Sequence, residues 1–317
     1  MIGEIFSLCA AVFWSLHLIF AKKAQNINKQ SANPMDPMVG LFITIFVNNV
    51  INALALIIRY GFWPPVPVNS AGLLFLTLAG LTNSFIGRGM LFVSVSMLGA
   101  AKAGLTKATA PVFVLLGGVF ILGERLGPWN WLGICIVLVG LFLMSFDTVR
   151  RESKNLTGTA RSDTAGKRAD QLYFIKGIAF GLGAALFMGT GNIFRKAGVT
   201  RIPDVILAVS VGSLIAMLTC FLVILKQRKF KDMLLAIKKI EFNYAMSGVF
   251  ASSALYTMVN LLRLIPVSIA NSISSTEPLF TILFVWLLKE GKKEKLSIQT
   301  LLFGVIMVTG TIILITM

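Results

Sequence analysis

Apolar residues along this chain occur in long, nearly uninterrupted runs, and polar residues gather in the short segments between them. The runs lack the alternation with period two that a membrane β-strand requires, so helices are favoured. A run of about 20 apolar residues matches the hydrocarbon thickness of a bilayer, in which a helix satisfies its own backbone groups. The pattern predicts ten transmembrane helices, at about residues 2–21, 37–58, 71–97, 101–122, 129–147, 173–195, 204–225, 243–263, 267–288 and 298–316.

Two segments depart from this pattern. Residues 148–172 contain few apolar residues and are predicted to form a flexible, basic linker. In residues 227–240, apolar side chains fall on one helical face and lysines on the other, which is typical of a helix in the lipid headgroup layer. The linker divides the chain into two five-helix units, residues 1–147 and 173–317.

The two units resemble each other in sequence. The segment GEIFSLCAAVFWSLHLIFAKKA from Gly3 aligns with GIAFGLGAALFMGTGNIFRKAG from Gly177, and TAPVF around Pro111 aligns with TEPLF around Pro278. Because each unit has an odd number of spans, the second unit enters the membrane with opposite polarity. Inverted repeats of this kind are typical of secondary transporters, whose substrate sites lie near the bilayer midplane between the repeats. We therefore expect an all-α membrane protein with a central cavity, and helix breaks at Pro111 and Pro278.

Composition supports a membrane protein and changes how the charge is interpreted. Of the 317 residues, 56% are hydrophobic and 13% are charged, and the mean hydropathy is +0.83. The chain has 29 Lys and Arg against 13 Asp and Glu, a net charge of +16 that in a soluble protein would suggest nucleic acid. Here most basic residues lie between the apolar runs, where they meet anionic lipid. We expect membrane lipid, and no nucleic acid, as a partner.

The first unit resembles a known repeat. Residues 99–143 are similar to the closing part of an EamA domain, the repeat unit of the EamA family in the drug/metabolite transporter superfamily, through Pro111, Gly123-Glu124, Gly133 and Gly140. The second copy has Pro278 and Gly304 but carries Lys289-Glu290-Gly291 in place of Gly-Glu. The resemblance implies ten helices around one central cavity, with the last helix of each half at the periphery. It also implies transport of a small solute such as an amino acid, a drug, a nucleoside or a sugar.

Three charged residues lie inside predicted spans. Arg88 is near the centre of its span, where a guanidinium costs about 2.5–3.5 kcal/mol on insertion scales, so it either binds an anion in the cavity or pairs with another helix. Glu277 is also central and is open to three roles: a partner of Arg88, a binder of a substrate cation, or a proton carrier. Lys107, one turn before Pro111, either faces the cavity or extends to the membrane surface.

Other polar and aromatic residues are candidates for a substrate site in the same central zone. Asn48 and Asn52 in one span, and Tyr256 and Asn260 in another, form stripes that either bind substrate or join helices by hydrogen bonds. His17, the only histidine, lies near a predicted span end and is either structural or a second proton-coupling residue beside Glu277. The remaining candidates are Trp14, Ser84, Asn192, Asn271 and Ser274.

Enzymatic and nucleotide-binding motifs are absent from the sequence, which contains no HExxH, no GxSxG, no P-loop and no clustered Cys and His. We therefore predict that the protein is not an enzyme and binds no metal or cofactor. The predicted function is secondary transport, by alternating access, of a small polar metabolite with an anionic group, such as an amino acid or a derivative, across the cell membrane. The transporter would be a monomer or a homodimer. The alternative is a non-transporting scaffold or sensor of the same fold.

Orientation is a point on which charge and resemblance disagree. Far more lysines and arginines follow the odd-numbered spans than the even-numbered ones. Since basic loops remain in the cytoplasm, this bias predicts that both termini lie outside and that residues 148–172 lie in the cytoplasm. The resemblance implies the opposite orientation, with both termini inside.

Overall fold

The protein is helical throughout the part of the chain that the structure describes. The computed structural model describes residues 2–30, 35–61, 69–158, 164–287 and 298–316. In the first half the helices are α1 (Ile2–Gln30), α2 (Pro37–Tyr60), α3 (Ser70–Ala79), the π-helix η1 (Gly80–Gly87), α4 (Arg88–Leu98), α5 (Ala100–Lys107), α6 (Ala110–Phe120) and α7 (Pro128–Gly158). In the second half they are α8 (Thr164–Arg201), α9 (Val205–Lys226), α10 (Phe230–Lys238), α11 (Phe242–Leu264), α12 (Val267–Ser274), α13 (Glu277–Leu287) and α14 (Ile298–Thr316).

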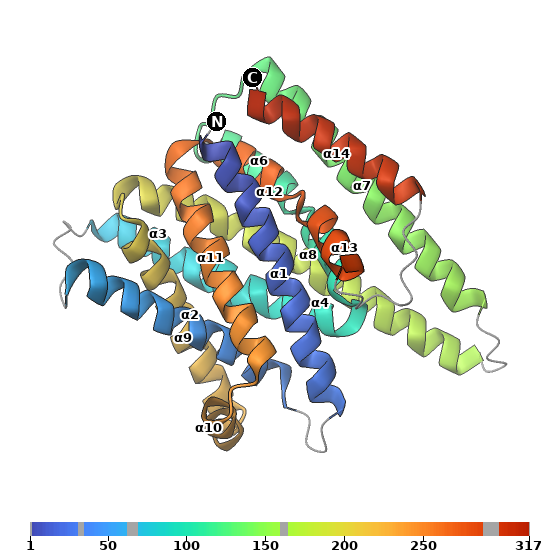
Figure 1. Ribbon diagram of the computed structural model, residues 1–317, viewed down its shortest axis with the longest axis horizontal. Coiled ribbons are helices and arrows are strands. Elements are labelled where there is room, and N and C mark those ends of the chain that lie inside the picture. The colour runs from blue at the N-terminus through green and yellow to red at the C-terminus, as the bar shows by residue number, and fades with distance from the viewer. Residues whose placement is uncertain (1, 31–34, 62–68, 159–163, 288–297, 317) are drawn as a thin grey trace.

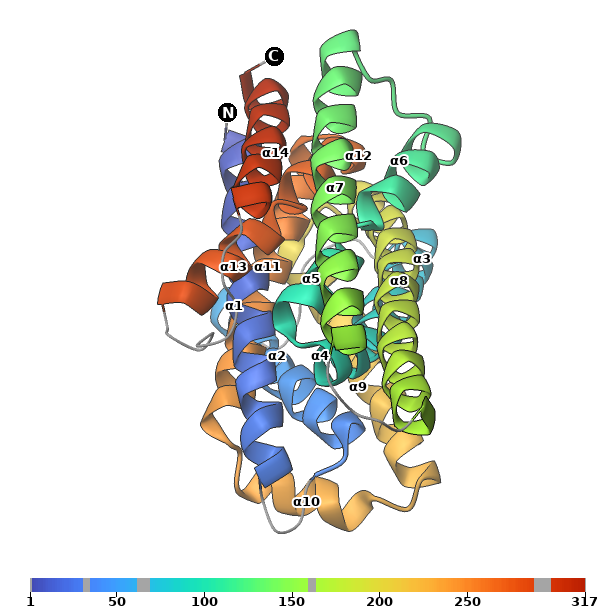
Figure 2. The same ribbon diagram turned by 90° about the vertical axis from the view of Figure 1, so that its right-hand side faces the viewer.

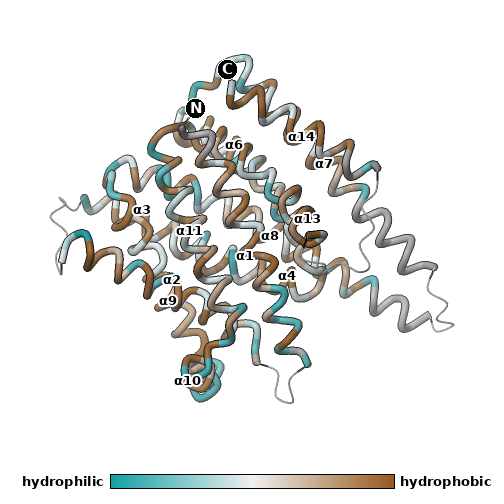
Figure 3. The backbone as a smooth tube through the Cα atoms, viewed as in Figure 1, coloured by the Kyte–Doolittle hydropathy of each residue, from teal (hydrophilic) through white to brown (hydrophobic). Residues whose placement is uncertain are grey.

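Most of these helices are long and apolar enough to cross a bilayer. Among the described residues, eight helical segments meet the length and composition that a span requires, and the apolar part of α14, Leu302–Thr316, is shorter. The predicted span 267–288 is divided between α12 and α13, each of which is too short to cross alone. Figure 3 shows apolar residues along these helices and mixed colouring on the short helix α10. The prediction of an all-α membrane protein is confirmed.

The two halves run in opposite directions through the molecule, as an inverted repeat requires. In Figures 1 and 2, α1 leads away from the end where both termini lie, whereas its counterpart α8 leads toward that end. The halves also interlock, because α1 packs against α11, and α3 and α4 pack against α8. The last helices of the two halves, α7 and α14, form a pair at one side of the bundle. The core therefore lies between the halves.

The segment predicted as a flexible linker is largely helical in the described residues. Helix α7 continues to Gly158 and α8 begins at Thr164, and both therefore extend into residues 148–172. The prediction of flexibility rested on the scarcity of apolar residues. That scarcity does not prevent a helix, because the Arg, Glu and Lys residues of 150–154 have high helix propensity and can extend a span into water.

Glycines allow η1 to lie in close contact with helices of the second half. A Cβ added at Gly80 would lie 2.4 Å from the carbonyl oxygen of Gly212 in α9. One added at Gly191 of α8 would lie 2.7 Å from the backbone nitrogen of Asn83 in η1. Small residues at such crossings let backbones approach closely, and the van der Waals packing that results is one of the forces that drive helix association in lipid.

We expect Gly80→Ala to destabilise the protein by at least about 1–3 kcal/mol, because the new methyl group meets backbone that cannot rotate away. The measurement is the midpoint of thermal unfolding in detergent. Gly89→Ala is the matched control two residues beyond η1, where the nearest atom, Leu41 Cδ2, lies at an ordinary 3.4 Å from the added Cβ. Equal midpoints for the two variants would contradict the close contact.

A side chain from the first half caps a helix of the second half. Gly123 has a φ of +67°, a value that glycine adopts without strain, and the turn there brings Glu124 toward α12. Glu124 Oε1 accepts a hydrogen bond from the Val267 backbone N–H at 2.5 Å. Glu124 Oε2 accepts from the Ser268 backbone N–H at 3.2 Å and from Ser268 Oγ at 2.6 Å. A carboxylate satisfies the free N–H groups of a helix start and complements its dipole.

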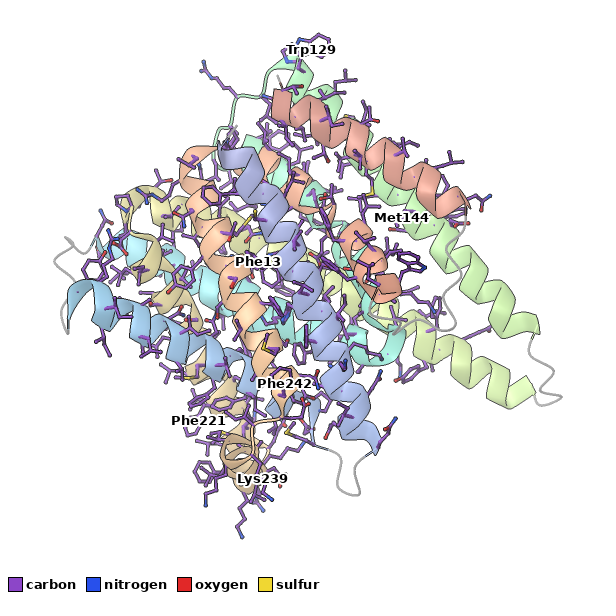
Figure 4. The ribbon with its side chains drawn as sticks, viewed as in Figure 1. Phe13, Trp129, Met144, Phe221, Lys239 and Phe242 are labelled. Atoms are coloured by element: carbon purple, nitrogen blue, oxygen red, sulfur yellow. The ribbon has the colours of Figure 1, made fainter. Side chains whose placement is uncertain are left out.

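The amphipathic segment predicted at 227–240 forms α10, at the end of the molecule opposite the termini (Figure 1). Met233 is buried and packs with residues of α2 and α9, and Lys229 Nζ lies 2.5 Å from Asp36 Oδ2 at the start of α2. Figure 4 places Lys239 at this end and Trp129 at the opposite end. Exposed basic residues gather here, namely Lys226, Arg228, Lys231, Lys238 and Lys239.

We expect the α10 end to face the cytoplasm, because exposed basic residues gather there and basic segments near span ends remain in the cytoplasm. The test uses a background in which the native cysteines Cys9, Cys135 and Cys220 are replaced by alanine. A single cysteine at Gln227 should then resist a membrane-impermeant thiol reagent in intact cells, whereas one at Gly127 should react. The reverse labelling would place the termini in the cytoplasm.

Candidate functional site

Two helix breaks, at equivalent places in the two halves, bring opposite charges to the centre of the molecule. Helix α5 ends at Lys107 and α6 begins just before Pro111; α12 ends three residues before Glu277, at Ser274, and α13 begins at Glu277-Pro278. Proline fits the first turn of a helix, where its missing N–H is not needed. A cation at a helix end and an anion at a helix start are both favoured by the helix dipole. The helix dipoles at the two breaks therefore stabilise the cation of Lys107 and the anion of Glu277.

Lys107 and Glu277 form a buried ion pair across the two halves. Lys107 Nζ donates a hydrogen bond to Glu277 Oε2, and the Glu277 residue is 3% exposed. The other carboxylate oxygen, Oε1, is buried without a hydrogen-bond partner. One of the three roles considered for Glu277, a partner of Arg88, does not agree with the structure, because Glu277 pairs with Lys107 instead. Lys107 faces the interior and does not extend to the membrane surface.

A small cavity, lined by both polar and apolar side chains, adjoins this ion pair. The cavity has a volume of about 50 Å³, which is room for a few water molecules. Most of its polar lining comes from one turn on each side of the two breaks and from α8. The lining residues are Trp14, Asn83, Lys107, Ala108, Ala110, Pro111, Met188, Asn192, Met258, Asn271, Ser274, Ser275 and Glu277.

Arg88 lies behind this lining with incomplete hydrogen bonding. It is 1% exposed, and its backbone N–H donates to the carbonyl of Asn83, five residues earlier, at the end of η1. Its guanidinium carbon lies 5.7 Å from the centre of the Trp14 ring, while Nε and Nη2 are buried without hydrogen-bond partners. π-Helical turns are frequent at functional sites. Burying a guanidinium without acceptors costs free energy. An anion that binds to the free donors of Arg88 would offset part of this cost.

Arg195 is a second buried arginine, which the sequence analysis placed at the very end of its predicted span, 173–195. Hydropathy ended that span at the charge, but α8 continues to Arg201, so Arg195 is inside and 4% exposed. Its Nη1 donates to Asn192 Oδ1 at 2.8 Å and its Nη2 to Ser84 Oγ at 3.4 Å. The spacing of three residues between Asn192 and Arg195, which puts both on one helical face, is the signal that could have identified it.

Three asparagines join the halves beside the cavity. Asn83 Nδ2 donates to Asn192 Oδ1 at 2.9 Å, and Asn192 Nδ2 donates to Asn271 Oδ1 at 2.8 Å. Asn192 and Asn271 were predicted site residues and both line the cavity. Asn83 was missed, although it is a polar residue in the middle of a predicted span. The amide groups provide donors and acceptors that a polar substrate can use.

Several predicted site residues lie away from the cavity lining. Asn48 Nδ2 donates to Ser252 Oγ at 2.7 Å, and Asn52 Nδ2 donates to Ser213 Oγ at 2.6 Å, so both join α2 to neighbouring helices. Asn260 Nδ2 donates to the Tyr256 carbonyl at 3.0 Å, and the Tyr256 hydroxyl is buried without a partner. For Asn48 and Asn52, the structure favours helix joining over substrate binding.

His17 is far more deeply placed than the predicted span end suggested. The apolar part of α1 spans Phe6–Asn28, which puts His17 near its middle, fully buried. Its Nδ1 lies 3.0 Å from the Ser247 carbonyl oxygen and 2.9 Å from Ser247 Oγ, while Nε2 is buried without a hydrogen-bond partner. Its ring centre is 5.6 Å from that of Trp14. His17 thus contacts the cavity wall from behind.

Comparisons with known proteins agree on the class of protein. The model of a family described as EamA-like transporter family matches residues 1–146 and again residues 175–316. An uncharacterized transporter in the cobO 3' region of Sinorhizobium sp is 30% identical over 146 residues, which are 45% of this chain and 95% of the relative. That relative is therefore about as long as one half of this chain. A crystal structure of a protein that is 14% identical aligns with a TM-score of 0.65 over 98% of this chain and 95% of the other, which shows a shared fold.

Proposed function

Because this chain belongs to the EamA-like transporter family, we propose that it is a secondary transporter that carries a small polar metabolite with an anionic group across the cell membrane by alternating access. The observation that supports an anionic group most directly is Arg88, a guanidinium with free donors next to the wall of a polar cavity. Substrate sites of inverted-repeat transporters lie near the midplane between the repeats. The ion pair of Lys107 and Glu277 joins the two repeats, which supports a substrate site beside it.

The size of the cavity supports movement during transport. Sites for small molecules usually have about 300–1,000 Å³, far more than the space found here, so the cavity must widen to take a metabolite. The two helix breaks supply short segments, α6 and α13, that can turn without bending a continuous hydrogen-bond ladder. The absence of a P-loop from the sequence supports a process driven by gradients.

The scaffold alternative makes a different prediction about the centre of the bundle. A closed, non-transporting bundle would pair Arg88 with Glu277 and leave no polar space. In the described residues, Glu277 pairs with Lys107, Arg88 keeps free donors behind Trp14, and a cavity with polar lining residues adjoins the ion pair. These observations favour transport.

The proposal is tested by counterflow in proteoliposomes. Vesicles containing the purified protein are loaded with one unlabelled metabolite from a panel of organic acids, amino acids, sugars and nucleosides. Labelled metabolite outside should then accumulate transiently for at least one acidic compound. Vesicles without protein are the control, and failure of every compound under both proton and sodium gradients would refute the proposal.

We expect Glu277→Gln to lose accumulation driven by a pH gradient while keeping exchange, because glutamine retains the shape and an acceptor but cannot bind and release a proton. The measurements are uptake with and without an inward proton gradient, and exchange at equal pH. Accumulation in the Gln variant at the wild-type level would exclude Glu277 as the proton carrier and would direct the search to His17.

A further inference from the structure

We propose that the central site is built for a small organic dianion, a metabolite with two negative charges such as a dicarboxylate or a phosphate monoester. This inference rests on the transport function proposed above and specifies the substrate class of the same site. It replaces the amino acid expected from sequence.

The balance of buried charge in the described residues is positive. The lysine and arginine residues buried there are Arg88, Lys107 and Arg195, and the buried carboxylate is Glu277. Glu277 already neutralises Lys107. Two guanidinium groups therefore remain without a carboxylate inside the membrane region, where charges ordinarily pair with one another.

The two arginines are close neighbours on one side of the cavity. Arg195 donates to Ser84, which lies one turn before Arg88 on the same continuous helical run. Arg195 also holds Asn192, and Arg88 lies over Trp14; both Asn192 and Trp14 line the cavity. A single lining side chain therefore separates each guanidinium from the cavity, namely Trp14 for Arg88 and Asn192 for Arg195. A rotation of the Trp14 ring would open the free Nε and Nη2 of Arg88 to a ligand.

Two guanidinium groups suit two anionic groups better than one. An arginine fork binds a carboxylate or a phosphate through parallel hydrogen bonds, and two adjacent forks can hold two carboxylates or the several oxygens of one phosphate. A ligand with a single negative charge would leave one guanidinium without a counter-charge. Net charge, and not size alone, is therefore the property that the site selects.

The ammonium group of an amino acid has no matching charge in this site. The carboxylate that would receive it, Glu277, is taken by Lys107. What remains of Glu277 is Oε1, a buried acceptor without a partner, which suits a neutral donor such as a hydroxyl group. A hydroxylated dianion would satisfy this acceptor as well as both arginines.

The test is a selectivity ratio measured by counterflow. Succinate represents the dicarboxylates, glycerol 3-phosphate the phosphate monoesters, lactate the monoanions and L-alanine the zwitterions. For wild-type protein, at least one dianion should compete at a concentration at least roughly 10-fold lower than lactate or alanine, since one extra charge-assisted contact is gained. Whether succinate or glycerol 3-phosphate competes better identifies the anionic group.

Variants at Arg195 separate its charge from its structural contacts. Arg195→Gln should bring the ratio of dianion to lactate close to one while uptake of lactate continues, and Arg195→Lys should keep most of the preference. Lys226→Gln, at the exposed end of α9, removes a cation far from the cavity and should change nothing. Thermal unfolding midpoints show that the variants are folded.

Three outcomes would count against the inference. If wild-type protein takes alanine or lactate as well as either dianion, transport stands and the dianion inference falls. If Arg195→Gln keeps the wild-type ratio, Arg195 does not select charge and the inference falls. If none of these four compounds moves but another compound of the wider panel does, transport stands and the dianion inference falls; failure of the whole wider panel refutes the transport function as well.

Discussion

Transport should fall at least roughly 100-fold when Arg88 is replaced by methionine, because two charge-assisted hydrogen bonds to the substrate, at about 1.5–3 kcal/mol each, are lost. Arg88→Lys should also lose most activity, since an ammonium group cannot form the paired contacts of a guanidinium. Unlike most losses of function, the methionine variant should unfold at a higher temperature than the wild type. The substitution removes a buried charge whose Nε and Nη2 have no hydrogen-bond partners.

The measurements are counterflow rate and thermal unfolding midpoint on the same preparation. Arg263→Met is the matched control, because Arg263 is exposed in the last turn of α11. It should leave both quantities unchanged. If Arg88→Met transports at the wild-type rate, Arg88 does not bind substrate. If its midpoint falls sharply, the Arg88 guanidinium stabilises the fold, which contradicts the interpretation of Arg88 as an uncompensated buried charge.

The second large effect concerns the ion pair of Lys107 and Glu277. Glu277→Leu should lower the free energy of unfolding by about 3–5 kcal/mol, because it leaves the Lys107 ammonium buried and unpaired. The double variant Lys107→Met, Glu277→Leu should recover most of this loss, since apolar residues of similar volume replace a buried pair at little cost. Transport should be absent from both variants.

A double-mutant cycle measures the coupling directly. The unfolding free energies of wild type, both single variants and the double variant are compared, and a favourable coupling of more than about 1 kcal/mol is expected for residues in contact. Additive effects would mean that the two side chains act independently. The ion pair would then contribute no coupling energy to the stability of the fold.

The fold could be predicted from sequence because it is encoded in simple patterns. The length of each apolar run matches the bilayer, and the repeat between the segments at Gly3 and Gly177 specifies two related halves. The prolines at 111 and 278 marked the places where the helices break, since a proline removes a backbone donor wherever it stands.

Parts of the site could not be predicted, for identifiable reasons. Hydropathy ends a span at its first charges, which placed Arg195 and His17 too close to a span end, whereas a helix continues as long as its backbone bonds are made. Lys22, which ended the first predicted span, instead donates to the Val95 carbonyl at 3.0 Å. The choice of Lys107 over Arg88 as the partner of Glu277 depends on how distant helices are rotated against each other. That rotation cannot be predicted from a single sequence.

The cap that Glu124 places on α12 has a consequence for the timing of motion between the halves. Any movement that separates the turn after α6 from α12 must first break the three hydrogen bonds to this carboxylate. A helix cap is worth about 0.5–2 kcal/mol, which corresponds to a factor of about 2 to 30 between two conformational populations. The Gly-Glu pair that marks the repeat in sequence would then favour the conformation in which the cap is formed, and its loss would shift the protein toward the other conformation.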